Sequence, residues 1–410
     1  MKIKKNKLNT TLMRNIDYWA GIPLCFVLSM HKKILQIANF SKRHDDEPKK
    51  ILLIKPSEMG AIILSYPLMN KIKKTMPNSQ LFFLTFKSNE KVFDILNIIP
   101  KENIFTIREN SFFGFILDFF SIIKKIRNEK FDITIDLEFY SRFSSIISHL
   151  SGAQKKAGFY RYSLEGLYRG DILTHRIQFN PHLHIADSFL SFFEIINLKK
   201  KDTPELVEMM NNENKNLPIF IPSNNETDLL FKKLTARGFN KLNKIFLINP
   251  GEGTLPLREW PLQNFITLSK EILRNQENQL ILVGTSKNSE KSRQLFESVN
   301  DTRCIDMSGE TTIMELLTLF SISEYLIIND CGLAHLASLT KIRQIVLFGP
   351  ETPKIFAPLS NSSNIIYKGL PCSPCLSPYN HRMSYCKNNE CLKNISINEV
   401  VNILKLTFVI

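Results

Sequence analysis

The sequence predicts an α/β protein whose strands form parallel, doubly wound sheets in two domains. Short apolar runs, typical of buried parallel strands, alternate with longer amphipathic stretches over 51–160 and again over 244–348. Because helices separate the strands, neighbouring strands need crossover connections and therefore run parallel. Turns rich in Gly, Asn and Asp follow some of these strands directly, and open α/β sheets bind ligands at such strand ends. The length of 410 residues provides room for two domains and a C-terminal appendage.

The charge of the chain indicates an anionic partner. Its formal net charge is +14, which suits nucleotide phosphates, a phosphorylated glycolipid, a membrane surface or nucleic acid. We rank nucleic acid last and expect none as a partner, because no dominant Lys/Arg block or nucleic-acid-binding motif is present. The hydrophobic content of 43% and the charged content of 22% are ordinary for a soluble globular protein.

Residues 1–48 are expected to form a basic N-terminal arm and linker. The apolar run 19–30 resembles a signal peptide, but no small-residue cleavage site follows it. It is also too short for a spanning helix, which needs roughly 20 apolar residues. A helix over 23–40 with lysines beside its apolar residues suits a surface-lying membrane helix; the alternative is an arm packed on the body of the protein.

The first domain is expected over 49–222. Its strands are predicted at 51–54, 81–86, 103–107, 131–137, 156–160 and 218–221. Its helices are predicted at 62–76, 112–127, 141–150 and 189–198, and Pro67 is expected near the start of the first one or at a kink within it. The loop after the first strand is where this fold keeps its chemistry, so four of its residues are candidates for ligand contacts: Lys55, Ser57, Glu58 and Gly60.

The second domain is expected over 223–370, followed by a tail over 371–410 that ends in a helix at 396–406. Its strands are predicted at 244–248, 279–284, 325–328 and 344–348. Its helices are predicted at 226–238, 262–273, 286–299, 311–320 and 333–339.

Two turns of the second domain are candidate anion sites. After strand 325–328, the backbone N–H groups at the start of a short helix favour an anion, and Asp330 and His335 add polar groups. The alternative is a capping Asp and a surface His. After strand 244–248, the Gly-rich turn from Asn249 through Gly251 to Thr254 lets backbone N–H groups approach a phosphate.

The cysteine pattern favours a reducing compartment, and we expect the protein in the cytoplasm. The chain has seven cysteines, an odd number that does not suit a secreted disulfide framework. Cys372, Cys375, Cys386 and Cys391 are clustered in the tail, and four thiols can form a structural zinc site. The wider spacing of the second pair favours reduced thiols over a bound metal, and zinc remains the alternative.

Three segments resemble motifs of glycosyltransferase family 9, the heptosyltransferase-like enzymes of lipopolysaccharide synthesis. Asp330-Cys331-Gly332-Leu333-Ala334-His335 is similar to its Asp-(Ser/Thr)-Gly-x-x-His signature, with Cys331 in place of the hydroxyl residue. Arg258-Glu-Trp-Pro resembles its Lys-Arg-Trp-Pro box, and Phe348-Gly-Pro its Gly-Pro-Thr box. The resemblance covers about 51–404 and implies the GT-B architecture, two facing Rossmann-like domains with a terminal helix that crosses back to the first domain.

The resemblance also implies a reaction. A sugar passes from a nucleotide-sugar donor, ADP-heptose-like, to a hydroxyl of a lipopolysaccharide or another cell-surface glycan. No metal or cofactor is needed, because Arg258 and the helix start offset the diphosphate charge. An anionic glycolipid acceptor and the basic surface imply peripheral contact with the inner face of the cytoplasmic membrane. The residues implied in donor binding are Asn249, Gly251, Thr254, Arg258, Asp330, Cys331, Gly332, Leu333 and His335.

One departure from the family concerns the base. Family members usually have Gly-Asp in the first loop, with the Asp as base on the acceptor hydroxyl, whereas this sequence has Gly60-Ala61. Glu58 lies in the same loop and reaches a similar place if the backbone bends at Gly60, so it is the candidate base. Lys55, Ser57, Gly60 and His184 are candidates for acceptor or phosphate contacts, and a half-buried His184 is the alternative. Two other functions remain open: a nucleotide-sugar-binding protein that lost its base at Ala61, and an enzyme that acts on the nucleotide sugar itself.

Overall fold

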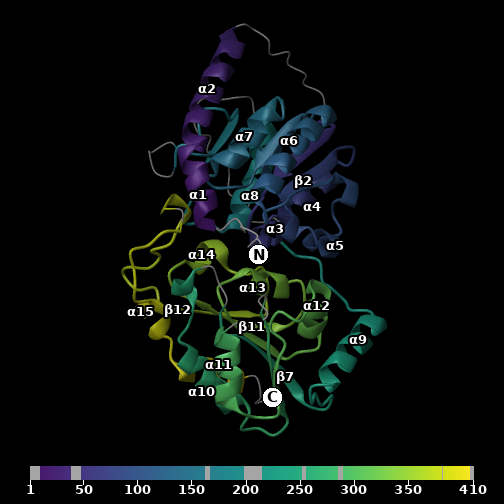
Figure 1. The fold of residues 1–410 in the computed structure, drawn as a ribbon, viewed down its shortest axis with the longest axis vertical. Coiled ribbons are helices and arrows are strands. Elements are labelled where there is room, and N and C mark those ends of the chain that lie inside the picture. The colour runs from purple at the N-terminus through teal and green to yellow at the C-terminus, as the bar shows by residue number, and fades with distance from the viewer. Residues whose placement is uncertain are drawn as a thin grey trace, which may run out of the picture. The chain divides into compact units, whose positions relative to one another are not determined.

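A computed structural model describes residues 10–37, 48–161, 167–197, 215–251, 255–284, 290–380 and 382–406. The chain forms two compact units (Figure 1). Unit 1 comprises Met1–Lys215 with Pro378–Asn380, and unit 2 comprises Asn216–Ser377 with His381–Ile410. Each unit contains one six-stranded sheet in which every strand pair is parallel, so the prediction of a doubly wound α/β protein is confirmed.

The sheet of unit 1 has the strand order β3-β2-β1-β4-β5-β6. Its strands are β1 (Lys50–Ile54), β2 (Gln80–Phe86), β3 (Ile104–Ile107), β4 (Ile133–Asp136), β5 (Lys155–Tyr160) and β6 (His175–Gln178). The central strands β1 and β4 are buried; β1 is apolar from Ile51 to Ile54, whereas β4 also buries the polar residues Thr134 and Asp136. The polar edge strand β6 was not predicted.

The helices of unit 1 that follow its strands include α3 (Met59–Leu64), α4 (Tyr66–Thr75), α5 (Val92–Leu96), α6 (Phe112–Glu129), α7 (Arg142–Leu150) and α8 (Ile185–Asn197). The helix predicted over 62–76 is divided into α3 and α4 at Ser65, so Pro67 lies at the start of the second helix. The hydroxyl and backbone N–H of Ser65 both bond to the end of α3, and Pro67 lies in the first turn of α4, a position that suits proline.

The N-terminal arm contains α1 (Thr10–Trp19) and α2 (Gly21–Ile37). Both pack against α7. The carboxylate of Asp17 accepts hydrogen bonds from the backbone N–H groups of Arg142 (3.0 Å) and Phe143 (2.8 Å) and pairs with the Arg142 guanidinium at 3.1 Å. The arm is therefore packed on the body of unit 1. No helix of the described segments is long and apolar enough to cross a membrane.

The sheet of unit 2 has the strand order β12-β11-β10-β7-β8-β9. Its strands are β7 (Lys244–Asn249), β8 (Asn278–Leu282), β9 (Cys304–Asp306), β10 (Tyr325–Asn329), β11 (Arg343–Phe348) and β12 (Ser363–Tyr367). The strand predicted at 218–221 is wrong: 215–223 contains no regular element, because Pro218 and Pro222 have no N–H to donate. The edge strands β9 and β12 were not predicted.

The helices of unit 2 include α9 (Asn224–Thr235), α10 (Leu262–Ile272), α11 (Glu290–Val299), α12 (Ile313–Ser321), α13 (Gly332–Ala337), α14 (Pro353–Phe356), α15 (Glu390–Lys393) and α16 (Ile397–Leu406). The expected crossing of the terminal helix is corrected. Helix α16 packs on α10 and buries Val400, Val401 and Leu404 in the core of unit 2, and only the short segment Pro378–Asn380 belongs to unit 1.

Candidate active site

In unit 2, Asp330 follows the central strand β10 and is buried at its end. Its backbone N–H donates to the carbonyl oxygen of Leu347 at the end of β11 (3.0 Å). The carboxylate lies 3.7 Å from Nη1 of Arg258. Burial raises the pKa of Asp330, and the charge of Arg258 opposes this rise. The structure thus brings together Asp330 and Arg258, which lie far apart in the sequence.

Arg258 is held in place by the loop that carries it. The side-chain amide of Asn389 donates to the carbonyl oxygens of Leu257 (3.2 Å) and Glu259 (2.8 Å). The backbone N–H of the buried Trp260 donates to Oδ1 of Asn329 (2.9 Å), at the end of β10. These bonds attach the loop to both the C-terminal tail and the central strand, which makes the position of the guanidinium rigid.

The guanidinium of Arg258 lies between two carboxylates. One belongs to Asp330, and the other belongs to Glu351, which contacts Nη2. Burial alone would lower the pKa of Arg258, but Asp330 and Glu351 outweigh it and hold the pKa above its usual value. Among the described residues, Nε of Arg258 has no hydrogen-bond partner, whereas Nη2 is ion-paired with Glu351. A buried donor without a hydrogen bond costs about 1–3 kcal/mol, which an anionic ligand can recover.

Sequence reasoning missed Glu351 and Arg382. Glu351 is buried in the loop after β11, and its Oε1 lies 2.8 Å from Nε of Arg382. Burial raises the pKa of Glu351 to about 7 despite the attraction of Arg258, and Asp330 adds to the rise. The signal available in the sequence was its place directly after Gly349-Pro350, at the end of a strand next to β10. Nothing in the sequence indicated Arg382, because its tail loop reaches Glu351 only through folding.

The remaining residues of the signature motif shape the start of α13. Cys331 is the N-cap residue without a capping side-chain bond, so the interpretation of Asp330 as the cap is wrong. Burial raises the pKa of the Cys331 thiol to about 11, against bonds from the backbone of Leu333 and Ala334, so it stays protonated near neutral pH. His335 is buried rather than exposed on the surface. Because α13 has only six residues, its helix dipole is small. Arg258 therefore supplies most of the positive charge at this strand end.

The Gly-rich turn lies at the same sheet edge, because β7 pairs with β10. Oδ1 of Asn249 accepts from the backbone N–H of Gly251 (3.2 Å), and its amide donates to the carbonyl oxygen of Val283 (2.8 Å). Gly251 has φ 116°, and a Cβ there would lie 2.9 Å from the Glu259 side chain. Asn249 therefore shapes the turn, and Gly251 is required by its conformation. Thr254 lies outside the described residues.

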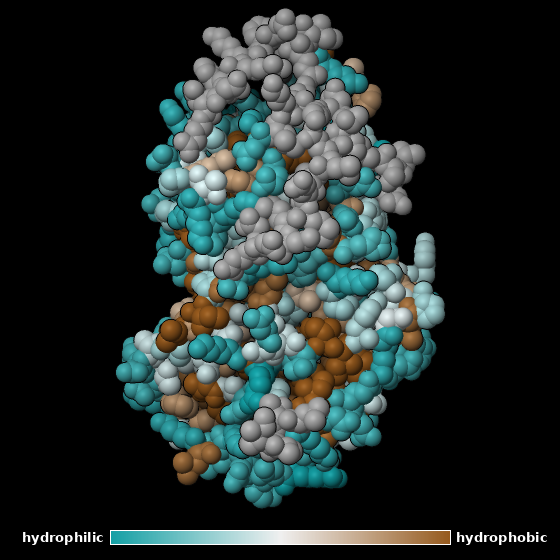
Figure 2. Space-filling view, turned by 180° about the vertical axis from the view of Figure 1, so that it is seen from behind, coloured by the Kyte–Doolittle hydropathy of each residue, from teal (hydrophilic) through white to brown (hydrophobic). Residues whose placement is uncertain are grey.

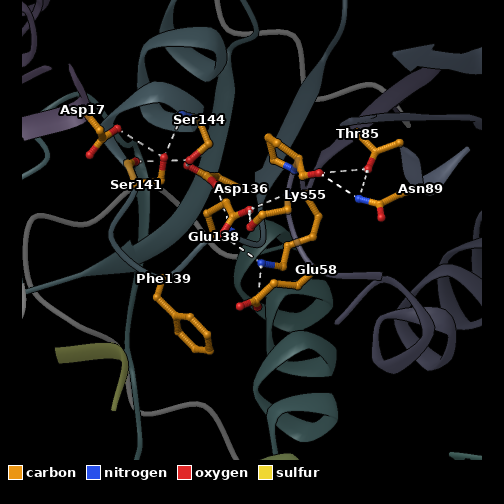
Figure 3. Close-up of polar contacts among 12 residues, drawn as sticks. Asp17, Lys55, Glu58, Thr85, Asn89, Asp136, Glu138, Phe139, Ser141 and Ser144 are labelled. Atoms are coloured by element: carbon orange, nitrogen blue, oxygen red, sulfur yellow. Dashed lines mark hydrogen bonds and ion pairs between the residues drawn. The ribbon is translucent and has the colours of Figure 1, made fainter. Parts of the chain in front are cut away.

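In unit 1, a second polar cluster surrounds Lys55 at the end of β1 (Figure 3). The fully buried ammonium donates to Oε2 of Glu138 (2.8 Å) and lies 3.5 Å from Oε2 of Glu58. The backbone N–H and the hydroxyl of Ser57 donate to the other carboxylate oxygen of Glu138 (3.1 and 2.7 Å). Lys55, Ser57 and Glu58 are thus brought together, and Lys55 is held between two carboxylates.

Sequence reasoning also missed Glu138, which follows β4 beside β1. Its loop is fixed by the buried Arg169, whose Nη1 donates to the carbonyl oxygens of Glu138 (2.9 Å) and Phe139 (2.8 Å). Nη2 of Arg169 pairs with the buried Asp136. Burial lowers the pKa of Arg169 to about 10, which still leaves it charged at neutral pH. The signal in the sequence was the position of Glu138 at a strand end next to the first loop.

Glu58 is the N-cap residue of α3 and has φ 67°, in the left-handed region. Such a conformation costs roughly 1–3 kcal/mol and is often found at functional sites. The expected bend at Gly60 is wrong: the bend lies at Glu58 itself, whereas Gly60 and Ala61 are inside α3. The Glu58 side chain is 35% exposed, so its carboxylate is accessible to a ligand.

His184 and the tail cysteines lie in other surroundings. Nδ1 of His184 accepts from the backbone N–H of Ala186 (3.2 Å), a local contact at the start of α8. The four tail thiols line one cavity of about 110 Å³, beside Leu257 and Pro350. All seven cysteines are free thiols, and burial raises the pKa of Cys391 to about 11. Within the described residues, no three His, Cys, Asp or Glu side chains have the arrangement needed to hold a metal ion.

Each unit has a parallel α/β sheet with a charged cluster at the carboxyl ends of its strands, which is where proteins of this architecture bind their ligands. The chain belongs to glycosyltransferase family 9 (heptosyltransferase), whose family model matches residues 119–385. As its name states, this family consists of glycosyltransferases. The resemblance found in the motifs is confirmed.

Individual relatives agree with this family. The chain is 28% identical to lipopolysaccharide heptosyltransferase 2 of Salmonella typhimurium over 120 residues, which span 28% of this chain and only 34% of the relative. It is 25% identical to lipooligosaccharide heptosyltransferase 2 of Haemophilus ducreyi over 77% of this chain and 88% of the relative. The structure of E. coli ADP-heptose lps heptosyltransferase II superposes with a TM-score of 0.64 and 18% identity, over 87% of this chain and 98% of that one, which shows the shared fold.

Proposed function

We propose that this protein transfers a sugar from a nucleotide-sugar donor, ADP-heptose-like, to a hydroxyl of a lipopolysaccharide or another cell-surface glycan. The observation that carries the proposal is the buried Arg258 beside Asp330 at the carboxyl edge of the second sheet, with its Nε atom lacking a hydrogen bond among the described residues. The similar proteins, which include the E. coli ADP-heptose lps heptosyltransferase II, support the donor class.

Arg258 is suited to the diphosphate of the donor. A guanidinium presents two parallel N–H groups to phosphate oxygens, and this bidentate contact is strong where water is excluded. The charge of Arg258 is offset by Glu351 in the free protein, and an arriving diphosphate competes with that carboxylate. We propose that no metal or cofactor is required, because Arg258 supplies positive charge for the leaving nucleoside diphosphate.

Glu58 is the proposed base. In the proposed step, the acceptor oxygen forms a bond to the anomeric carbon while the bond from that carbon to the phosphate oxygen breaks. The hydroxyl proton passes to the Glu58 carboxylate, and the nucleoside diphosphate leaves with the electron pair of the broken bond. Lys55 holds Glu58 in place at 3.5 Å, and Glu138 fixes Lys55 in turn, so Lys55 and Glu138 are positioning residues.

We propose that the enzyme acts at the cytoplasmic face of the inner membrane, where a lipid-anchored acceptor is accessible. The net charge of +14 supports attraction to anionic lipids and to a phosphorylated glycolipid. We expect no nucleic acid among its partners.

Isothermal titration against a panel of nucleotide sugars, ADP-heptose included, tests the donor site. We expect one tight ligand, weakened by about tenfold or more in Arg258→Ala, because a charge-assisted contact contributes roughly 1.5–3 kcal/mol. Asp330→Ala should also weaken binding, because Asp330 helps to position the Arg258 guanidinium. Arg293→Ala, on the exposed face of α11, is the matched control and should bind as the wild type does. Thermal melting checks that each variant is folded. Absence of binding by every nucleotide sugar would refute the proposal.

The base is tested by Glu58→Gln and by returning a carboxylate to position 61. Glu58→Gln should lower turnover roughly a hundredfold and leave donor binding unchanged. Ala61 lies three residues further along, in the first turn of α3, so Ala61→Asp should restore part of the turnover in the Glu58→Gln protein. Unchanged turnover in Glu58→Gln would instead indicate a different base or a non-catalytic binding protein.

A further inference from the structure

Helix α2 buries its small and polar residues rather than its large apolar ones. Gly21, Cys25, Ser29 and Lys32 form its buried face. A Cβ on Gly21 would lie 2.8 Å from the Arg142 side chain, so only glycine permits this close approach to α7. The ammonium of Lys32 donates to the carbonyl oxygens of Asp171 (2.7 Å) and Leu173 (2.9 Å).

The outward side of the arm carries large apolar side chains. On α2, Leu24, Phe26, Val27, Met30 and Ile34 are exposed, and on α1 the indole of Trp19 is 77% exposed. A helix on a water-exposed surface normally shows the opposite distribution, with apolar residues inside and polar residues outside. This inverted pattern indicates that the outward side of α1 and α2 is covered by an apolar medium.

Helix α6 continues this apolar surface on the other side of α7. Its residues Phe115 and Phe119 pack on Phe143 of α7, with ring centroids 5.2 and 5.8 Å apart. Phe113, Leu117 and Phe120, at helical spacing on α6, are exposed. Figure 1 shows α2, α7 and α6 side by side in unit 1, in agreement with their contacts. Figure 2 shows the opposite side, where hydrophilic residues predominate in the coloured part of the surface and hydrophobic patches lie in unit 2.

The charges around this surface identify what covers it. The only acidic residue of Thr10–Ile37 is Asp17, whose carboxylate is bonded to α7. The two acidic residues of α6 are paired, Asp118 with Arg108 (2.8 Å) and Glu129 with Lys50 (2.6 Å). Four exposed cations have no ion pair with any residue that the structure describes: Lys33 on α2 and Lys124, Lys125 and Arg127 on α6. An apolar surface with a cationic border matches an anionic lipid bilayer.

We propose that α1, α2 and α6 form a docking surface on which unit 1 binds the surface of an anionic lipid bilayer. No described helix can cross a membrane, so these helices lie in the interface with their apolar side chains among the acyl chains and their lysines at the headgroups. The inference deepens the proposed function. It rests on that function only where it explains the purpose of docking, which would bring unit 1 to a lipid-anchored acceptor.

Co-sedimentation with vesicles tests the docking surface. Wild-type protein should bind vesicles of equimolar phosphatidylcholine and phosphatidylglycerol, and bind pure phosphatidylcholine on the order of tenfold more weakly. Val27→Glu combined with Phe113→Glu should lower binding to the mixed vesicles on the order of tenfold or more. The matched control is Ile221→Glu combined with Leu242→Glu, which changes two apolar residues of unit 2 that are 82% and 90% exposed and should leave binding unchanged.

Trp19 provides a second measurement. The chain has two tryptophans, and Trp260 is buried in unit 2. Brominated acyl chains should therefore quench the fluorescence of Trp19, and Trp19→Phe should abolish the effect. Equal binding by the Val27→Glu/Phe113→Glu protein and the wild type would overturn the proposal. So would a wild-type protein that dimerises through this face and does not bind vesicles. Donor titration of the same variants needs no membrane, so it separates a failure of docking from a failure of the proposed function.

Discussion

Glu351 should make donor binding depend on pH. Its carboxylate is buried against the guanidinium groups of Arg258 and Arg382, and Asp330 is the other carboxylate next to Arg258. Burial raises the pKa of Glu351 to about 7. Above this pH the ionised carboxylate competes with a diphosphate for Arg258, and below it the neutral carboxyl does not. Donor affinity should therefore increase as the pH falls through neutrality.

The size of the effect follows from the titration of one group. Between one unit below and one unit above its pKa, the protonated fraction falls from roughly 0.9 to roughly 0.1, so affinity should fall about tenfold, or about 1.4 kcal/mol. Glu351→Gln keeps the shape and loses the charge. This variant should bind the donor about tenfold more tightly than the wild type at pH 8 and show little change between pH 6 and pH 8.

Calorimetry in two buffers of different ionisation enthalpy measures the linked proton directly. Wild type should take up a proton on binding near pH 7.5, and Glu351→Gln should not. The diphosphate of a nucleotide sugar stays ionised throughout this range, so the slope belongs to the protein. Asp330→Asn tests whether the second carboxyl next to Arg258 contributes to the same pH dependence. Glu297→Gln, on the exposed side of α11, is the control that should change nothing. An unchanged pH dependence in Glu351→Gln would refute the reasoning.

Two further substitutions test the supporting structure. Asp17→Asn leaves the buried guanidinium of Arg142 without its charged partner and should lower the free energy of unfolding by about 3 kcal/mol in urea titrations; a loss under about 0.5 kcal/mol would show that the arm is not anchored there. Gly251→Ala places a Cβ against Glu259 at a left-handed position and should weaken donor binding about tenfold, through a strain of about 1–3 kcal/mol. Gly152→Ala, also left-handed but with open space around it, should leave donor affinity unchanged, so an equal effect of both would point to backbone strain alone.

The central strands could be predicted from the sequence because they are buried on both faces and therefore contain an uninterrupted run of four apolar residues or more. β1, β7, β10 and β11 are of this kind, and each was predicted near its observed position. The edge strands were missed for the opposite reason. β6, for example, begins with His175 and Arg176, whose polar side chains give no apolar run. The alternation of strand and helix still indicated the fold, because it depends on the central strands.

The site could be predicted only as far as its residues lie at strand ends within recognisable motifs. Arg258 and Asp330 were found in this way. Glu138 and Arg382 were not, because they reach Lys55 and Glu351 through tertiary packing that no local pattern records. The arm shows the same limit: a helix was predicted over most of α2, but its buried face is decided by the close approach of Gly21 to Arg142.

The two charged clusters share one arrangement, and this has a consequence for ligand binding. In each, a buried cation lies between two carboxylates: Lys55 between Glu138 and Glu58, and Arg258 between Asp330 and Glu351. A buried charge without a partner would cost folding free energy. The carboxylates therefore allow each cation to be buried in the folded protein before any ligand binds. An anionic donor must then either displace a carboxylate in unit 2 or bind when that carboxylate is protonated. The raised pKa of Glu351 makes its protonation possible near neutral pH. In unit 1 the partly exposed carboxylate is that of Glu58. It can take the proton from the hydroxyl of the sugar acceptor, while Lys55 stays paired with Glu138.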